Sequence, residues 1–364
     1  MTPPDTPLNR NTSLPPYRGR GATRQVPNRY DALHTDLDVD EEVERRGGQI
    51  ATEVSVDASK SALSRNDSPD LPFRWSANPY RGCEHGCPYC YARPSHEYLG
   101  FSPGLDFETQ IVAKPTLPAL LSKQFQSTSW APDLVVLSGI TDPYQPVERS
   151  RRITRDTLAV FAAHRNPVAV ITKNALVTRD LDHLRSLARV EAVHVTISLT
   201  TLRPDLARVM EPRASTPSAR LNAIRLLAEA GIPVGVNIAP VIPGLTDEEI
   251  PAIVGAAADA GANRASHIIV RLPGPVATVF EEWLRTHRPD RADRILNRIR
   301  EARAGRLNDP RFTHRFRSNG AYAQALSQSF RLAASRHGLE TAFPTLSTRH
   351  FRHLRHGQVG LFDE

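Results

Sequence analysis

From about residue 71 onward, short apolar runs alternate with amphipathic segments, and this alternation constrains the fold more than any other feature. The runs that predict strands are Phe73–Tyr80, Leu134–Ser138, Val168–Thr172, Val193–Leu199, Val234–Val241 and His267–Val270. Near-continuous, β-branched runs of this length are typical of strands buried on both faces of a parallel sheet. The chain is therefore expected to form an α/β domain.

The segments between these runs carry apolar residues at three- and four-residue spacing, which indicates helices. Gly231 stands where a C′ glycine would end one helix. Thr246 with Glu249 predicts a capping box at the start of the next helix, and Gly261 is expected to end it. Strands with crossover helices predict an open parallel sheet or a partial (βα)6 TIM-like barrel, with its active site at the carboxyl ends of the strands.

Composition divides the chain into three parts. Residues 1–70 are rich in Pro, Ser, Thr, Asn and charge, and we expect a mostly disordered N-terminal extension. Residues 71–275 form the barrel, and residues 276–364 form a basic helical extension that ends in a tail (HGQVGLFDE). Residues 285–364 carry 16 Lys and Arg against 7 Asp and Glu. We interpret this excess as a solvated helical surface, because no aromatic pattern is interleaved with it.

The three cysteines of the chain, Cys83, Cys87 and Cys90, fall within eight residues. An odd number in so tight a group argues against a disulfide framework and for a metal or cluster site in a reducing compartment. No apolar run approaches the roughly 18 residues of a membrane span, and the N-terminus lacks the apolar core of a secretory signal. We expect a soluble cytoplasmic protein that does not interact with membranes.

The number of thiolates, three, distinguishes between kinds of metal site. Structural zinc takes a closed set of four ligands, and His85, inside the motif, would complete a Cys₃His zinc site. Electron-transfer [4Fe–4S] clusters usually have four thiolates. With three thiolates, a four-iron cluster keeps one iron open to a small molecule, and this is the interpretation we favour.

The motif itself carries a resemblance. The sequence NPYRGCEHGCPYCYAR, with CxxxCxxC spacing and Tyr89 before the last cysteine, opens the array of strands and helices. It resembles the radical S-adenosylmethionine (SAM) superfamily. The strings SGITDPYQPVE, ITKN, ISLTT, MEPRA and APVIPGLTD further resemble its spore-photoproduct-lyase-like branch, over about residues 70–275.

This resemblance implies an enzyme with a [4Fe–4S] cluster and SAM as cofactors. In the superfamily, one electron from the cluster cleaves SAM to a 5′-deoxyadenosyl radical, which abstracts hydrogen from the substrate. A reducing partner such as flavodoxin or ferredoxin would supply that electron.

Positions after the strands are candidates for SAM contacts. The predicted contacts are Ser138, Thr141, Lys173, Ser198, Glu211, Arg213 and Asn237. Relatives bind the methionyl amino group after the second strand, and Lys173, after the third, is expected to pair with the carboxylate as a point charge. Several of these positions have a structural alternative. Thr141 would lie in a backbone turn, Glu211 and Arg213 would form a surface ion pair, and Asn237 would be a buried structural amide.

The substrate stays open. Spore photoproduct lyase returns a hydrogen atom with a further cysteine, and this chain has none beyond the three. Tyr144 or Tyr98 would have to replace it, or the step is absent. We therefore withhold dimer repair, although a nucleic-acid substrate remains open. The alternative function is a non-catalytic nucleic-acid-binding protein with a structural zinc or iron–sulfur site.

Overall fold

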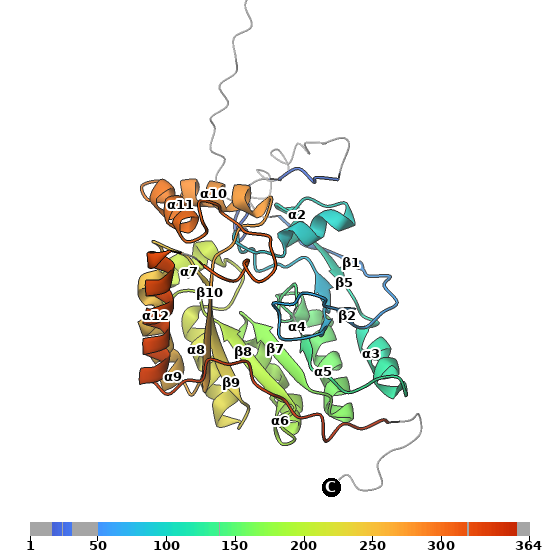
Figure 1. The fold of residues 1–364 in the computed structure, drawn as a ribbon. Helices are drawn as coiled ribbons and strands as arrows, with labels where there is room; N and C mark the ends of the chain where they lie inside the picture. Colours follow the sequence, from blue (N-terminus) through green and yellow to red (C-terminus); the bar gives the residue numbers. More distant parts are fainter. Residues whose placement is uncertain (1–16, 24, 31–49, 138, 319, 355–364) are drawn as a thin grey trace, which may run out of the picture.

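A computed structural model describes residues 17–23, 25–30, 50–137, 139–318 and 320–354 (Figure 1). The strands are β1 Glu53–Val56, β2 Ser64–Arg65, β3 Trp75–Ala77, β4 Tyr80–Arg81, β5 Gln110–Ala113, β6 Val135–Leu137, β7 Val168–Thr172, β8 Val193–Ser198, β9 Val234–Val241 and β10 Arg264–Ile269. The α-helices are α2 Asp106–Thr109, α3 Leu117–Gln126, α4 Glu148–Arg151, α5 Ile153–His164, α6 Leu181–Ala188, α7 Pro204–Met210, α8 Pro217–Glu229, α9 Ile250–Asp259, α10 Val276–His287, α11 Ala292–Glu301 and α12 Ala321–Arg336. The 3₁₀ helices are η1 Arg93–Leu99, η2 Ala175–Asp180 and η3 Asp247–Glu249.

Two sheets organise the described chain. The larger has the order β10-β9-β8-β7-β6-β3-β2, in which every neighbouring pair is parallel except β2 with β3. The smaller has the order β1-β5-β4, with β5 parallel to β1 and antiparallel to β4. The α/β class and the six parallel strands are confirmed. The strand order is that of an open sheet. The partial (βα)6 barrel therefore stays a prediction.

The core lies between the large sheet and its crossover helices. Val170, Val195 and Val236 on neighbouring strands are at most 1% exposed, and they pack in one cluster with Phe161 of α5 and Ile224 of α8. Helix α5 contacts both α3 and α6, and α9 contacts both α8 and α12, so the outer helices pack side by side in two groups (Figure 1). Burial on both faces explains why the strands are apolar throughout.

Strand boundaries agree best with the prediction in the middle of the large sheet. Strands β7 and β9 have the predicted bounds, and β8 ends one residue before the prediction. Strand β10 begins at Arg264, three residues before the prediction, because its polar first half pairs in register with β9 as Arg264 with Gly235. An edge strand of this kind accepts polar residues that the pattern does not reveal.

Helix ends agree in part. Gly231 and Gly261 follow α8 and α9 with φ of 72° and 97°, as expected for C′ glycines. The predicted capping box is wrong. The Thr246 hydroxyl accepts from the Ile242 amide at 2.9 Å, and the Glu249 carboxylate is instead bonded to Leu202 N at 2.8 Å. Glu249 thus connects two loops that are distant in the sequence, whereas Thr246 closes a turn within its own loop.

The described parts of the N-terminal extension pack against the domain. Strand β1 pairs with β5, and Tyr17, Ala22 and Val26 are buried with Leu105 and with Val279 of α10. Residues 1–16, 24 and 31–49 lie outside the described residues, so the predicted disorder of residues 1–70 stays a prediction.

The C-terminal part contains the expected helices. Helices α10 and α11 lie across the same end of the molecule as α2, and α12 lies against α9 (Figure 1). The tail from residue 355 lies outside the described residues. Within the described chain, no helix has the length and apolar character to cross a bilayer.

Candidate active site

The cysteine loop, which runs from Gly82 to Cys90, follows β4. Gly82 and Gly86 have φ of 75° and 68°, a left-handed conformation that favours glycine. Hydrogen bonds from Gly86 N to Cys83 O and from Cys90 N to Cys87 O, 3.5 and 3.2 Å long, curl the backbone. The curl directs all three thiols toward one cavity. Cys83 and Cys87 are buried there, and Cys90 is half-buried.

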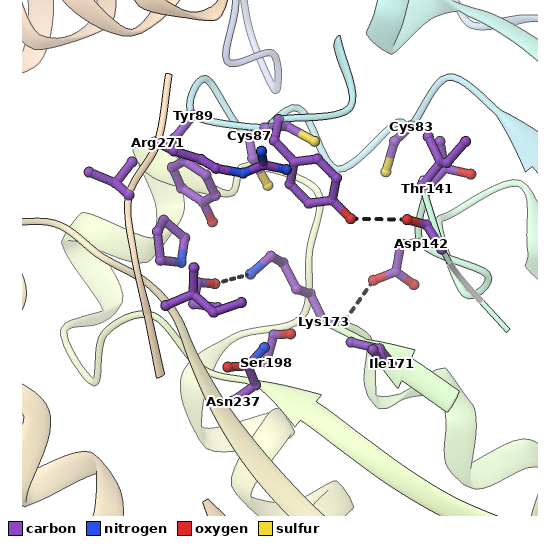
Figure 2. A pocket seen from close by; sticks show the side chains of 18 of the residues that line it. Cys83, Cys87, Tyr89, Thr141, Asp142, Ile171, Lys173, Ser198, Asn237 and Arg271 are labelled. Carbon is purple, nitrogen blue, oxygen red and sulfur yellow. Dashed lines mark hydrogen bonds between the residues drawn. The ribbon is translucent and has the colours of Figure 1, made fainter. Parts of the chain in front are cut away.

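The cavity has a volume of about 390 Å³ and lies at the carboxyl ends of the central strands (Figure 2). Small-molecule sites have volumes of about 300 to 1,000 Å³. The three cysteines form one wall. The other walls include Thr141 after β6, Lys173 after β7, Ser198 at the end of β8, Asn237 in β9 and Arg271 after β10. The parallel topology therefore brings distant parts of the sequence to one place.

The predicted cofactor contacts divide into two groups. Those that line the cavity are Thr141, Lys173, Ser198 and Asn237. The Thr141 hydroxyl donates to Tyr80 O at 2.6 Å, and Asn237 Oδ1 accepts from the Ser266 hydroxyl at 3.0 Å. Glu211 and Arg213 are not among the lining residues, and Ser138 lies outside the described residues.

Lys173 supplies a positive charge to the cavity. Its ammonium donates to Ala239 O at 2.9 Å and lies 3.2 Å from Glu211 Oε1. It also lies 5.7 Å from the centre of the Tyr89 ring, within the range of a cation–π contact. Figure 2 shows the side chain reaching into the space below the cysteines. Lys173 therefore places a positive charge on the cavity, and its pairing with a cofactor carboxylate stays a prediction.

Glu211 is fully enclosed beneath the cavity wall. It accepts hydrogen bonds from the hydroxyls of Tyr89 and Thr200 and forms a buried ion pair with Arg220. Burial alone would raise the pKa of Glu211, but the charges of Arg220 and Lys173 and the Tyr89 hydrogen bond hold it below its ordinary value. Glu211 therefore stays ionised and fixes the positions of Lys173 and Tyr89.

Arg213 lies elsewhere than predicted. Its guanidinium is 3.2 Å from Glu84 Oε1 and donates to the Thr52 hydroxyl at 3.2 Å. The structural alternative, a surface ion pair of Glu211 with Arg213, is wrong, because Arg220 pairs with Glu211 and Glu84 pairs with Arg213. Arg213 instead braces the outer side of the cysteine loop.

Asp142 and His85 are held by other groups of the protein. Asp142 accepts from the Thr172 hydroxyl, from Lys173 N and from Tyr144 N at 2.7, 2.7 and 2.9 Å. His85 Nδ1 lies 3.5 Å from Asp142 Oδ2. Among the described residues, no three His, Cys, Asp or Glu side chains converge to hold a single ion. His85 also lines the cavity beside the three cysteines, so the Cys₃His zinc site stays an alternative prediction.

The environment of the thiols fits a cluster. Burial raises the pKa of Cys83, Cys87 and Cys90, because a thiolate is poorly solvated there. None of the three forms a disulfide. Bound iron would supply the positive charge that three buried thiolates need. The donor set therefore fits an iron–sulfur cluster with three protein ligands.

Tyr144 and Tyr98, which we considered as hydrogen donors, are not the tyrosines beside the cysteines. Tyr144 is buried away from the cavity and donates to Asp180 at 3.0 Å, and Tyr98 is 73% exposed and stacks on Tyr30. Neither lines the cavity. Tyr89 and Tyr91, which flank Cys90, do line it.

An arginine–aromatic stack, which we did not predict from the sequence, contributes Tyr91, Arg271, Arg315 and Phe316 to the lining of the cavity. Arg271 lies 4.9 Å from the centre of the Tyr91 ring and 5.0 Å from that of Phe316, and Arg315 lies 5.0 Å from Phe316 and 4.9 Å from Phe312. Burial lowers the pKa of Arg271, with Tyr91 opposing this shift. Asp70 pairs with Arg315, and its charge also acts on Arg271, but among the described residues no carboxylate lies within salt-bridge distance of Arg271.

The stack corrects one prediction. The C-terminal region was expected to lack interleaved aromatic residues, yet the segment FTHRFR at residues 312–317 alternates rings with arginines. That signal was present in the sequence. What the sequence does not reveal is that Arg271 and Tyr91 continue the series into the cavity.

The fold and the site together define the class of protein. It is an α/β protein in which three thiols line a cavity at the carboxyl ends of the strands, as a candidate cluster site. A family model for the radical SAM superfamily matches residues 77–257. An uncharacterised protein of Mycobacterium tuberculosis is 38% identical over 245 residues, which cover 66% of this chain and 71% of the relative. This chain belongs to the radical SAM superfamily.

Other relatives are more distant. An uncharacterised protein of Methanocaldococcus jannaschii is 28% identical over 176 residues, covering 48% of this chain and 63% of the relative. A mutant of spore photoproduct lyase, solved with bound AdoMet and dinucleoside spore photoproduct, has a TM-score of 0.59. It is 16% identical, with 87% of this chain and 88% of that chain covered, and so shares the fold.

Proposed function

We propose that this protein is a radical SAM enzyme that binds a [4Fe–4S] cluster through Cys83, Cys87 and Cys90 and cleaves SAM reductively. The observation that carries this proposal is that the three thiols and the Lys173 ammonium line the same cavity. Three thiolates leave one iron of a four-iron cluster without a protein ligand, and a carboxylate bound there would need a cation beside it. We also propose that the large sheet curves into a partial barrel.

The lining residues have separate roles in this account. When bound, the cluster supplies the electron that cleaves the S–C5′ bond of SAM. Lys173 pairs with the SAM carboxylate, and Ser198 and Asn237 offer hydrogen bonds to its polar groups. Ala239 and Pro240 provide an apolar surface for the adenine. The electron comes from a reduced partner such as flavodoxin or ferredoxin, in a reducing compartment such as the cytoplasm.

The substrate is proposed to be an anionic, planar molecule, with single-stranded nucleic acid as the candidate class. Arg271 offers a positive charge with no carboxylate of the described chain within salt-bridge distance, and Tyr91 and Phe316 offer ring faces beside it. Phosphates pair with arginine, and bases stack on aromatic rings. The solved relative that carries a dinucleoside lends support. Thymine-dimer repair is not proposed, because the chain has no fourth cysteine.

Metal analysis of anaerobically purified protein tests the cluster. We expect about four iron and about four sulfide per chain, as a cubane cluster contains. A single zinc per chain would instead support a structural site and contradict the enzymatic proposal. The Cys87→Ala variant is the matched control, since loss of one of three thiolates should abolish the iron.

A further inference from the structure

An N-terminal strap, residues 17–22, lies against the outer side of the cysteine loop. Its tightest point is Gly21, where a methyl group would lie 1.6 Å from the carbonyl oxygen of Gly86. Real Cβ atoms never come that close, so only glycine allows the strap to reach the loop. Gly86 directly precedes Cys87. The strap therefore touches the loop backbone next to a predicted cluster ligand.

One buried carboxylate joins the strap to the loop. Glu108, which is fully buried, accepts from Gly21 N at 3.0 Å and from Ala22 N at 2.8 Å. The same carboxylate pairs with Arg93 at 2.5 Å. Arg93 in turn donates twice to Cys87 O, at 3.0 and 2.9 Å. A continuous chain of hydrogen bonds thus runs from the strap to the backbone of Cys87.

Arg20 forms a second connection. It is 6% exposed and donates to Glu108 O at 2.7 Å and to the Thr52 hydroxyl at 3.0 Å. Thr52 donates to Glu84 Oε1 at 2.9 Å. Glu84 follows Cys83 in the sequence and is 3% exposed. The strap thereby holds the loop at both of its buried cysteines.

Arg18, two residues away, provides a contrast. Arg18 is exposed, whereas Arg20 is buried among the contacts described above. A strap that merely covered the surface would not need a buried arginine, because burial of an unpaired charge is costly. Hydrogen bonds from the Arg20 guanidinium to several acceptors offset this cost of burial. Arg20 is therefore built into the site rather than attached to it.

We propose that the strap belongs to the cofactor site, where Arg20 and Gly21 act as positioning residues that fix the cysteine loop for cluster binding. This inference rests on the proposed function. Groups that orient metal ligands from behind contribute strongly to metal retention. Closure of the outer side also limits the access of water to the cluster, and solvent exposure is one determinant of cluster potential.

The test compares full-length wild type with Arg20→Ala and with the matched control Arg18→Ala. Each protein is reconstituted anaerobically with iron and sulfide and then exposed to air, and the loss of the cluster's visible absorption is followed. We expect Arg20→Ala to lose the cluster about tenfold faster, the lower end of what such outer groups contribute. Arg18→Ala should match wild type. Circular dichroism of the cluster-free proteins checks the fold.

A second variant, Gly21→Ala, tests the same contact by adding one methyl group and keeps the test decisive if Arg20→Ala does not fold. Its cluster should bleach faster, and its reduction potential should be more positive, because water stabilises the more negatively charged reduced form. A purely structural strap would leave the potential of the retained cluster unchanged. If wild type binds a cluster and the folded variants match it in cluster lifetime and reduction potential, the strap inference is overturned and the proposed function stands. If wild type binds none, the proposed function fails with it.

Discussion

The ammonium of Lys173 lies 3.2 Å from the buried carboxylate of Glu211, and this pair connects the floor of the cavity to the core. The Lys173 side chain is 16% exposed, while that of Glu211 is 1% exposed. Glu211 is already neutralised by Arg220, at the other end of its carboxylate. Lys173 thus retains positive charge for a ligand, and Glu211 holds that charge in place.

Replacement of Lys173 by methionine should weaken SAM binding. A hydrogen bond to a charged group contributes roughly 1.5–3 kcal/mol, so we expect the Kd of the cluster-loaded protein for SAM to rise about 10- to 100-fold. Equilibrium dialysis under anaerobic conditions measures this. Lys123→Met, which changes an exposed lysine on α3, is the control and should bind like wild type. Equal affinities in all three proteins would contradict the assigned role of Lys173.

Replacement of Glu211 by glutamine should destabilise the fold. Removal of one partner of a buried pair costs about 3–5 kcal/mol, because Arg220 is left buried without its counter-charge. The control is Glu229→Gln, in an exposed pair with Arg225, which should cost less than about 1 kcal/mol. Urea unfolding at pH 7 measures both free energies. A cost for Glu211→Gln as small as that of the control would refute the assignment.

The same variant predicts a pH dependence. The folded-state pKa of Glu211 is held below its ordinary value of 4.5, so the carboxylate stabilises the fold fully above the unfolded pKa and less as the pH falls. The difference between wild type and Glu211→Gln should therefore be constant from pH 7 to about 5.5 and shrink below pH 4.5. Thermal melts across this range test the sign, and a gap that widened in acid would oppose it.

The cysteines and the histidine of the motif should differ in their effects. We expect Cys87→Ala to lose the iron and keep the fold. We expect His85→Asn to keep the iron, because Nδ1 of His85 lies 3.5 Å from Asp142 Oδ2 and is engaged there. Iron and zinc content after anaerobic purification, with circular dichroism, gives the result. Loss of metal on His85→Asn would favour the Cys₃His zinc site, and a full cluster in Cys87→Ala would disprove the ligand assignment.

Arg271 should affect the substrate rather than the cofactor. We expect Arg271→Met to weaken binding of a single-stranded DNA oligonucleotide about tenfold, within the range of a charge-assisted hydrogen bond, while SAM affinity is unchanged. Fluorescence anisotropy over a series of salt concentrations measures it, with Arg294→Met, an exposed arginine of α11, as the control. If wild type and Arg271→Met bind the oligonucleotide equally, the proposed substrate class is wrong.

The sequence predicted those features that local pattern determines. The runs at Val168–Thr172 and Val234–Val241 gave strands with the right bounds, because burial on both faces leaves no room for polar residues. Gly231 and Gly261 ended their helices for a local steric reason. The three cysteines were found by their spacing alone, and the structure places them on one cavity.

Features that depend on long-range contacts were not predictable. Arg20 and Glu108 are 88 residues apart, and no periodicity links them. Glu249 has the spacing of a capping box but bonds to Leu202, 47 residues earlier in the chain. Arg213 follows Glu211 closely in the sequence, yet the intervening turn sends the two side chains to different partners. Tertiary packing decides among such local alternatives.

The most direct measurement of the central claim is the formation of 5′-deoxyadenosine. Anaerobically reconstituted protein is incubated with dithionite and SAM, and the products are separated by liquid chromatography and identified by mass spectrometry. The account predicts 5′-deoxyadenosine from wild type and none from Cys87→Ala. Absence of this product from wild-type protein that carries a full cluster would contradict the account.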